Sequence, residues 1–311
     1  MHYIKEKKNY QESQSRQMST FSNKLNKIAN DTNAYLKNFF LKQIKNSYLL
    51  YPMKYGIFSG GKRFRGAIVV NTGKIYNINH KTLIIISAAI ECLHSYSLIH
   101  DDLPSMDNDE LRRGKLSVHK KFNEFTAILA GNSLLTLAFE ILSGKDLKIN
   151  KNCKNDLIRT LSVCAGHSGL AGGQYYDLSF ENKKISKQKI IDMQKNKTGK
   201  LFGFCCESIA IVEGMNLKKR KQLKEIGINI GLLFQTVDDL IDHTGSSSVV
   251  GKPTKRDKKK GKATLINLLG YEETVNFAKN LKKKIDKQIK KYGTKAGDLL
   301  DSVEFILERK F

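Results

Sequence analysis

Long apolar segments at helical spacing constrain the fold of this chain more than any other feature. Apolar residues dominate four of them, which run from Thr82 to His100, Ala127 to Leu142, Lys200 to Glu213 and Leu223 to Ile241. A helix that is apolar on most of its circumference is buried inside a protein, and no convincing run shows the period-two pattern of a strand. We therefore predict an all-α fold, a single large bundle of ten or more helices packed around a shared centre.

The chain ends and the apolar content predict a cytoplasmic protein. The N-terminal segment 1–20 is polar and is expected to form a poorly ordered tail before one domain at 21–311. The start lacks the apolar core of a secretory signal. No uncharged apolar segment reaches the roughly 20 residues of a membrane span, because the best run, Leu83 to Ile90, stops at Glu91. The five cysteines show no C-x-x-C spacing and are expected to be mostly buried free thiols.

The positive charge of the chain does not by itself indicate nucleic-acid binding. The formal net charge is +24, but most of the basic residues are lysines scattered among asparagine and isoleucine. Such a bias can reflect genome composition as readily as function. Five of the nine arginines stand in the motifs described below, and arginine binds phosphate with a bidentate geometry that lysine cannot copy.

Two acidic clusters lie in apolar surroundings, far from one another along the chain. The first contains Asp101, Asp102 and Asp107, and the second contains Asp238, Asp239 and Asp242. Carboxylates in such surroundings are costly to desolvate without cations. Mg²⁺ is commonly shared between one or two carboxylates and a substrate phosphate. Because lysine and arginine flank both clusters, the sequence predicts a polyphosphate bridged by Mg²⁺ between them.

The spacing within each cluster suits a shared cation. Asp238 and Asp242 are four residues apart and share one face of a helix, where like charges repel unless a cation joins them. Asp101 and Asp107 would point in different directions on a regular helix. Pro104 excludes an undisturbed helix at this point, and a bulged helix end would bring the two carboxylates together.

Further polar residues have both a functional and a structural interpretation. The turn at residues 60–65 combines two glycines with Lys62 and Arg65, as in an anion site, although basic surface loops are common. His94 is either a hydrogen-bonded core residue or a ligand-binding one. Residues 197–200 open an apolar helix and are similarly ambiguous, and the lysine-rich loop 252–262 is either solvated or part of a phosphate site.

Together these motifs resemble those of one family, the trans-isoprenyl diphosphate synthases or polyprenyl synthetases, from about Ser59 to the C-terminus. The aspartate-rich first motif with two extra residues makes the chain most similar to the bacterial farnesyl diphosphate synthases. The motifs occur in family order at residues 60–65, 101–107, 111–114, 172–178, 197–201, 234–239 and 238–242. The resemblance implies the isoprenoid synthase fold, with helices around a central active-site cavity, and a homodimer.

The resemblance also implies a reaction and the residues that perform it. Isopentenyl diphosphate would be joined head to tail to dimethylallyl or geranyl diphosphate to give farnesyl diphosphate. Three Mg²⁺ ions, with Mn²⁺ as a substitute, would be held by Asp101, Asp102, Asp107, Asp238, Asp239 and Asp242. The allylic diphosphate would be bound by Arg112, Lys197, Lys252 and Lys262. Isopentenyl diphosphate would be bound by Lys62, Arg65, His94 and Arg113. Thr198, Gln235 and the Lys197 carbonyl would stabilise the allylic cation, and the basic C-terminus near Arg309 and Lys310 would act as a lid.

Product length is expected to depend on the residues just before the first acidic cluster. Tyr96 lies five residues before Asp101, with Ser97 beside it, and a large aromatic there would close the floor of the pocket. By resemblance this predicts a fifteen-carbon product, with a geranylgeranyl diphosphate synthase as the alternative. The loop 251–257 departs from the family pattern, because Lys255 replaces a glycine and Arg256 a lysine, which leaves the role of Asp257 near the third metal less secure.

Other functions fit the sequence less well. A class I terpene cyclase also uses an aspartate-rich motif with Mg²⁺, but it needs neither the Lys62 and Arg65 site nor the second aspartate motif. A basic nucleic-acid-binding protein would bind with a steep dependence on salt concentration. A catalytically idle regulatory subunit is disfavoured by the intact acidic motifs. We therefore expect diphosphate substrates, no nucleic acid and no transmembrane segment.

Overall fold

The computed structural model describes residues 2–43, 48–245 and 261–309, with the side chains of residues 2–19 and 43 excepted. Lys252, Lys255, Arg256, Asp257 and Lys310 lie outside the described residues, so the predictions that concern them are not addressed. The boundary at residue 20 also stays a prediction. The first helix begins at His2, and its core-facing residues start at Phe21.

The described residues form an all-α structure, as the helical spacing predicts. More than ten α-helices make up almost all of its regular structure, and strands are confined to one two-residue pair. The helices are α1 (His2–Gln43), α2 (Leu50–Ile57), α3 (Phe64–Ile75), α4 (His80–Asp101), α5 (Val118–Lys121), α6 (Glu124–Ser143), α7 (Lys151–Ala165), α8 (Leu170–Ser179), α9 (Lys187–Gln194), the π-helix η1 (Lys195–Gly199), α10 (Lys200–Val212), α11 (Leu217–Thr244), α14 (Leu265–Leu269), α15 (Tyr271–Ile289), the 3-10 helix η2 (Lys290–Ala296) and α16 (Gly297–Glu308).

The strand pair is the one element of regular structure that the spacing did not predict. Strands β1 (Leu111–Arg112) and β2 (Lys115–Leu116) form a small antiparallel hairpin. The backbone of Arg113 and Gly114 has positive φ at its turn, a conformation that tight hairpin turns require. Arg112 and Arg113 therefore lie on a hairpin instead of a helix.

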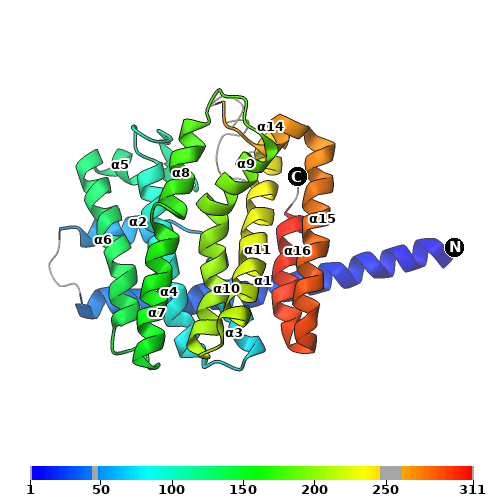
Figure 1. The fold of residues 1–311 in the computed structure, drawn as a ribbon, viewed down its shortest axis with the longest axis horizontal. Coiled ribbons are helices and arrows are strands. Elements are labelled where there is room, and N and C mark those ends of the chain that lie inside the picture. The colour runs from blue at the N-terminus through cyan, green and yellow to red at the C-terminus, as the bar shows by residue number, and fades with distance from the viewer. Residues whose placement is uncertain (1, 44–47, 246–260, 310–311) are drawn as a thin grey trace.

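Asparagine side chains begin the long helices. Asn79, Asn123 and Asn216 precede α4, α6 and α11, and each accepts a hydrogen bond from a backbone N–H two or three residues later. Each cap therefore fixes the residue at which its helix begins. Figure 1 shows α6, α7, α10 and α11 standing next to one another, with α15 and α16 beyond α11 and α1 crossing the row.

Helix α4 is the centre of the core, and α11 packs closely against α10. Most side chains of α4 are buried, including charged Glu91. A Cβ atom on Gly227 of α11 would lie 2.2 Å from the Phe202 carbonyl oxygen of α10, and one on Gly231 would lie 2.7 Å from the Gly199 Cα. The two backbones touch at these glycines, which fixes α11 against η1 and α10.

In the part of the chain that the structure describes, two helices are long and apolar enough to cross a membrane by length and composition alone. In α4, 78% of the apolar window is buried, and this helix is part of the core. In α6 the buried share is 44%, so that helix keeps an apolar outer face. Phe125, Ile128 and Leu129 are the large exposed side chains on it.

Candidate functional site

A cavity of about 820 Å³ collects almost all of the residues that the motifs singled out. Its lining comes from the helices α1, α3, α4, α8, α9, η1, α11 and α16, from the loop that follows α2, from the segment between α4 and α5, and from residues 262–264 before α14. The predicted residues in the lining are Lys62, Arg65, His94, Ser97, Asp101, Asp107, Arg112, Arg113, Lys197, Thr198, Gln235, Asp238, Asp239, Asp242 and Lys262. The aspartates of both clusters thus face one cavity, as the sequence predicts. Asp102 and Tyr96 do not line it.

The first acidic cluster lies where α4 ends, and the chain then turns back on itself. The Asp107 N–H donates to the Asp101 carbonyl at 2.9 Å, and the Asp109 N–H donates to the Asp102 carbonyl at 3.1 Å. Pro104 lies within this turn, where it ends the helix. The turn explains how Asp101 and Asp107 reach the same cavity although they are six residues apart.

Asp102 has a different environment from the one expected for a metal ligand. It is 2% exposed, and it accepts hydrogen bonds from Arg112 Nε, at 2.9 Å, and from Arg112 Nη2. Arg112 also lies 3.5 Å from Asp109. A bidentate pair of this kind fixes the plane of a guanidinium group. Asp102 therefore orients Arg112, while Asp101 and Asp107 are the carboxylates of this cluster at the cavity.

Asp101 is in an environment that disfavours its ionised form. Burial raises the pKa of Asp101 to about 6, against the attraction of Lys197, and the nearby charge of Asp107 raises the pKa further. Two buried carboxylates facing one cavity are stabilised when a cation is shared between them.

Lys197 lies in the π-helix η1, an irregular turn that directly precedes α10. The π-helix η1 places Lys197 and Thr198 toward the cavity, and π-helical turns are frequent at functional sites. A Cβ atom on Gly173 of α8 would lie 2.1 Å from the Lys197 backbone nitrogen. Gly173 thus permits the close approach that sets Asp177, one turn further along α8, against the Lys197 ammonium.

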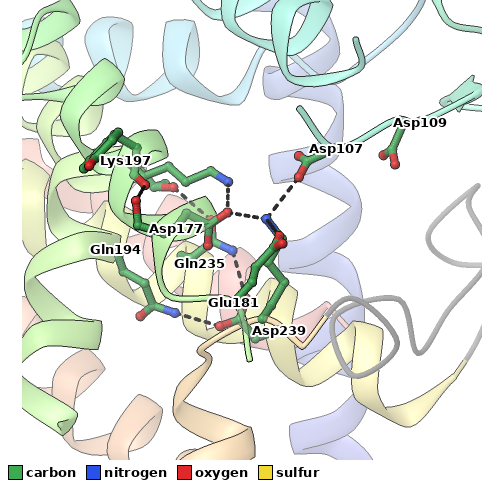
Figure 2. A network of polar contacts seen from close by, with 12 residues as sticks. Asp107, Asp109, Asp177, Glu181, Gln194, Lys197, Gln235 and Asp239 are labelled. Carbon is green, nitrogen blue, oxygen red and sulfur yellow. Dashed lines mark hydrogen bonds and ion pairs between the residues drawn. The ribbon is translucent and has the colours of Figure 1, made fainter. Parts of the chain in front are cut away.

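Asp177 joins two lysines that come from distant parts of the chain. Its Oδ2 lies 2.7 Å from Lys197 Nζ and 2.8 Å from Lys262 Nζ. Lys262 also lies 3.0 Å from Asp107 and 2.9 Å from Glu181. Burial raises the pKa of Asp177, but Lys197 and Lys262 outweigh it and leave the pKa below its usual value. Figure 2 shows Asp107 facing Asp177 and Lys197 across this network.

A chain of hydrogen bonds begins beside Lys197, at Thr198 of η1, and continues to α11. Thr198 Oγ1 donates to Gln235 Oε1 at 2.8 Å, and Gln235 Nε2 donates to Asp239 Oδ1 at 2.8 Å. Gln194 Nε2 donates to the other oxygen of Asp239 at 2.7 Å (Figure 2). Asp239 is 3% exposed. This carboxylate therefore fixes the orientation of two amides, and Asp238 and Asp242 are the more accessible members of the second cluster.

Asp238 is paired with the C-terminal end of α16. Arg309 Nη2 lies 2.7 Å from Asp238 Oδ1, and the guanidinium group stacks 4.6 Å from the centre of the Phe234 ring. Arg309, expected near a lid, thus lies at the cavity wall. The ion pair with Asp238 therefore places the Arg309 guanidinium group against the second acidic cluster.

A second group of cations lies on the other side of Asp101, and we call Lys62, Arg65, His94 and Arg113 the cationic pocket. Arg65 Nη1 lies 3.0 Å from His94 Nε2. Lys62 lies 4.8 Å from the Phe305 ring centre, and Arg113 donates to the Gly60 carbonyl. Burial lowers the pKa of Arg65, and it lowers the pKa of Arg113 to about 10. The pKa of His94 falls well below its usual value because the ring is buried and because Arg65 lies beside it. His94 is therefore neutral, and the pocket favours an incoming anion.

The turn before α3 needs its glycines to make this pocket. Gly60 and Gly61 have φ of 107° and 103°, which only glycine adopts readily. A Cβ atom on Gly61 would also lie 2.5 Å from a guanidinium nitrogen of Arg113. The two glycines therefore let the turn before α3 approach the Arg113 guanidinium group closely.

Several functional side chains were not assigned from the sequence. Gln174 is 4% exposed and lines the cavity, and neither polar atom of its amide has a hydrogen-bond partner among the described residues. Asp177 and Gln174 belong to the motif at 172–178. That motif could have indicated both residues, although it did not specify a role for either. Gln194, Glu181 and Glu91 carried no signal in the sequence, because their partners are far away in the chain.

The cysteines do not supply a nucleophile. All five are free thiols, and all but Cys153 are buried, as expected. Burial raises the pKa of Cys164 and of Cys206 to about 12. Both thiols are therefore protonated near neutral pH, and a thiolate is the form that attacks.

The acidic residues fit magnesium only when a phosphate completes the site. Within residues 2–43, 48–245 and 261–309, no group of three His, Cys, Asp or Glu side chains is arranged to hold an ion by itself. The donors at the cavity are carboxylate oxygens, which suit a hard cation. Lys262 already lies among three of these carboxylates, which shows that the cluster accommodates a cation. Mg²⁺ is typically bound by one or two carboxylates together with substrate phosphates.

Comparisons with known proteins agree with this geometry. The sequence pattern of the Polyprenyl synthetase family matches residues 46–300. The chain is 37% identical over 302 residues to the farnesyl diphosphate synthase of Haemophilus influenzae, covering 94% of this chain and all of that protein. It is 38% identical over 239 residues to the farnesyl diphosphate synthase of Escherichia coli, covering 76% of this chain and 80% of that protein.

A solved structure extends the likeness to three dimensions. The geranyltransferase of Helicobacter pylori, in a complex with magnesium and isoprenyl diphosphate, is 30% identical and superimposes with a TM-score of 0.79. The match covers 94% of this chain and 96% of that one.

Proposed function

Because the chain belongs to the polyprenyl synthetase family, we propose that its cavity joins isopentenyl diphosphate to an allylic diphosphate with the help of magnesium. The chain is a trans-prenyltransferase of the farnesyl diphosphate synthase type. The single observation that supports this function best is that the two acidic clusters and two groups of cations face one cavity. Homologues named farnesyl diphosphate synthase favour a fifteen-carbon product over the geranylgeranyl alternative.

The allylic diphosphate would lie between the two acidic clusters. Asp101 and Asp107 on one side and Asp238 on the other would hold three magnesium ions with the diphosphate oxygens, with Mn²⁺ as a substitute. Magnesium bound there supplies positive charge that stabilises the leaving diphosphate. Arg112, whose plane is fixed by Asp102, and Lys197 and Lys262, which are joined by Asp177, would bind the remaining oxygens.

The carbocation that remains would be stabilised by oxygen dipoles. Gln235 donates to Asp239 and accepts from Thr198, so its amide cannot rotate without losing both bonds. Such preorganised dipoles stabilise developing charge without the cost of reorientation. The Thr198 hydroxyl and Gln235 carbonyl oxygens lie on the wall beside Lys197 (Figure 2), which is where charge develops as the diphosphate departs.

Isopentenyl diphosphate would occupy the cationic pocket, with Lys62, Arg65 and Arg113 binding its phosphates and neutral His94 donating or accepting a hydrogen bond. Its double bond would attack the allylic carbon and form the new carbon–carbon bond. The proton lost in the same step would pass to the departed diphosphate. The reaction therefore needs no base from the protein, in keeping with the protonated thiols.

The apolar face of α6 supports a homodimer. Phe125, Ile128 and Leu129 are 67%, 41% and 46% exposed, and their spacing places them on one helical face. Exposed apolar patches of this kind mark protein–protein contacts. We expect Leu129→Asp to shift the protein from dimer to monomer in analytical ultracentrifugation, and an unchanged mass would exclude this face. A cytoplasmic location is proposed on the basis of the five free cysteines.

Product analysis tests the proposed function directly. The purified protein is incubated with isopentenyl diphosphate and either dimethylallyl or geranyl diphosphate, and the products are sized by chromatography after phosphatase treatment. We expect fifteen-carbon products with Mg²⁺ and none in EDTA. Asp101→Asn and Asp238→Asn should each lower turnover by a factor of about 10³, similar to losses at other charge-stabilising sites. Turnover that survives EDTA would refute a magnesium-dependent reaction.

A further inference from the structure

A buried carboxylate lies among the arginines of the cationic pocket, and the proposed reaction gives it no task. Glu91 of α4 is 2% exposed and contributes to the cavity lining. Its Oε1 accepts a hydrogen bond from the Gly66 N–H at 3.2 Å, and its Oε2 lies 3.6 Å from Arg63 Nη1. The side chains of Glu91 and Arg63 are each 3% exposed, so water cannot supply the missing solvation.

Glu91 also acts on the two arginines that face the substrate. Burial lowers the pKa of Arg65 and of Arg113, and attraction to Glu91 is the largest influence that opposes this effect on each pKa. Arg63, Arg112 and Arg65 lower the pKa of Arg113 further by repulsion. The pocket therefore brings together cations that repel one another, and Glu91 offsets part of that repulsion.

The net charge of this region is close to that needed for one diphosphate ester. Lys62, Arg63, Arg65 and Arg113 are positive, while the lowered pKa of His94 makes that residue neutral. With Glu91 included, the local charge is about +3 at neutral pH. A diphosphate monoester carries about three negative charges near pH 8, because its terminal phosphate loses a second proton with a pKa of about 6. Without Glu91 the cations would outnumber the charges of the ligand.

We propose that Glu91 is a positioning residue, the resident counter-anion of this region. It lies against Arg63 in the cavity lining, where its negative charge offsets the repulsion among the arginines and opposes an incoming diphosphate. This inference rests on the proposed function of the cationic pocket as a diphosphate site. Removing one partner of a buried ion pair leaves an uncompensated charge and destabilises the fold. The same removal strengthens binding of an anion, because less negative charge opposes it. A residue that served only packing would lower stability and affinity together.

The test measures the two effects separately in Glu91→Gln, which keeps the size of the side chain and the acceptor for the Gly66 N–H. Thermal unfolding gives stability, and calorimetric titration with inorganic pyrophosphate gives affinity. Both are done in EDTA so that the magnesium-dependent site does not take the probe. We expect a lower midpoint for the variant in buffer and a Kd for pyrophosphate about tenfold smaller, which corresponds to about 1.4 kcal/mol. Glu91→Asp, which keeps the charge, should bind within about threefold of the wild-type protein.

Glu207→Gln is the matched control. Glu207 is 6% exposed and also lies 3.6 Å from an arginine, Arg220, with Lys224 at 2.9 Å, but it is not among the side chains that line the cavity. Its variant should unfold at a lower temperature and bind pyrophosphate with the wild-type Kd. A tighter Kd in this control would show that the effect is not specific to the pocket and would overturn the assignment.

Other outcomes are equally decisive. Unchanged or weaker pyrophosphate binding by Glu91→Gln would overturn the counter-anion role while leaving the proposed enzyme function intact. If Glu91→Gln does not fold in buffer, excess pyrophosphate should restore folding by supplying the missing negative charge, and failure of that rescue would also overturn the role. A wild-type protein that binds no pyrophosphate would instead refute the diphosphate site itself, and the inference with it.

Discussion

Replacement of Asp177 by asparagine should weaken the interaction of this enzyme with its allylic substrate. Asp177 is almost buried, and one of its oxygens accepts from Lys197 at 2.7 Å and from Lys262 at 2.8 Å. An asparagine of the same size keeps the packing but removes the charge that draws the two ammonium groups together. The lysines would then move apart before the diphosphate arrives.

The expected loss follows from what each lysine keeps. A hydrogen bond to a charged group contributes about 1.5–3 kcal/mol. Lys262 retains Asp107 and Glu181 at 3.0 and 2.9 Å, so its position changes little. Among the described residues, Asp177 is the one carboxylate within ion-pair distance of Lys197. We therefore expect the lost Lys197–Asp177 hydrogen bond to cost about 2 kcal/mol of transition-state stabilisation, which corresponds to roughly a thirtyfold fall in kcat/KM for the allylic substrate.

Steady-state kinetics with each substrate varied in turn provides the assay. In Asp177→Asn the loss should appear when geranyl diphosphate is varied, and the KM for isopentenyl diphosphate should stay within about twofold of its wild-type value. Asp156→Asn is the control, because it breaks another 2.7 Å ion pair, with Arg220, away from the cavity. A kcat/KM for geranyl diphosphate that stays within twofold of wild type, or an equal loss on both substrates, would refute the reasoning.

Three further predictions concern packing, product length and pH. Gly173→Ala should lower the free energy of unfolding by about 3 kcal/mol in urea denaturation, because its methyl group would lie 2.1 Å from the Lys197 nitrogen; an unchanged midpoint would mean that α8 and η1 can separate freely. Tyr96→Ala should lengthen the main product in chromatography, and the same product length would exclude Tyr96, whose ring meets that of His100 edge to face with centroids 4.8 Å apart, as the determinant. Burial raises the pKa of Asp298, but Lys24 and Lys74 outweigh it and leave the pKa below its ordinary value. Its contribution, about 0.5–1 kcal/mol for a half-exposed pair, is therefore present above about pH 4 and lost as the pH falls through the lower folded pKa. Thermal midpoints of wild type and Asp298→Asn should converge in acid, and a gap that widens there would contradict the sign.

Local sequence was sufficient for the helices and for the chemistry of the motifs. Apolar spacing predicts the buried helices, and the caps at Asn79 and Asn216 are local features, because a cap acts within three residues. Pro104 correctly indicates that α4 ends at the first acidic cluster. The ordered motifs predicted the family, since each residue type there has a specific affinity for phosphate or for a hard cation.

Residue roles that depend on the orientation of neighbours were beyond the sequence. Asp101 and Asp102 are adjacent and chemically identical, yet one faces the cavity and the other binds Arg112. The hairpin that carries Arg112 is too short to show an alternating pattern. Tyr96 was expected to line the pocket, whereas Ser97 and Leu98 reach the described cavity and Tyr96 packs against His100.

The amino-acid sequence by itself determined which segments are helical and which residues can bind a diphosphate, because propensity, capping and ligand chemistry are local properties. Only the tertiary structure decided the partners of Asp177 and Glu91. Lys197 and Lys262 belong to segments far from Asp177 along the chain, and Arg63 precedes a different helix from the one that carries Glu91. The physical reason is that a buried charge takes its role from the charges around it, and packing of distant helices sets those neighbours.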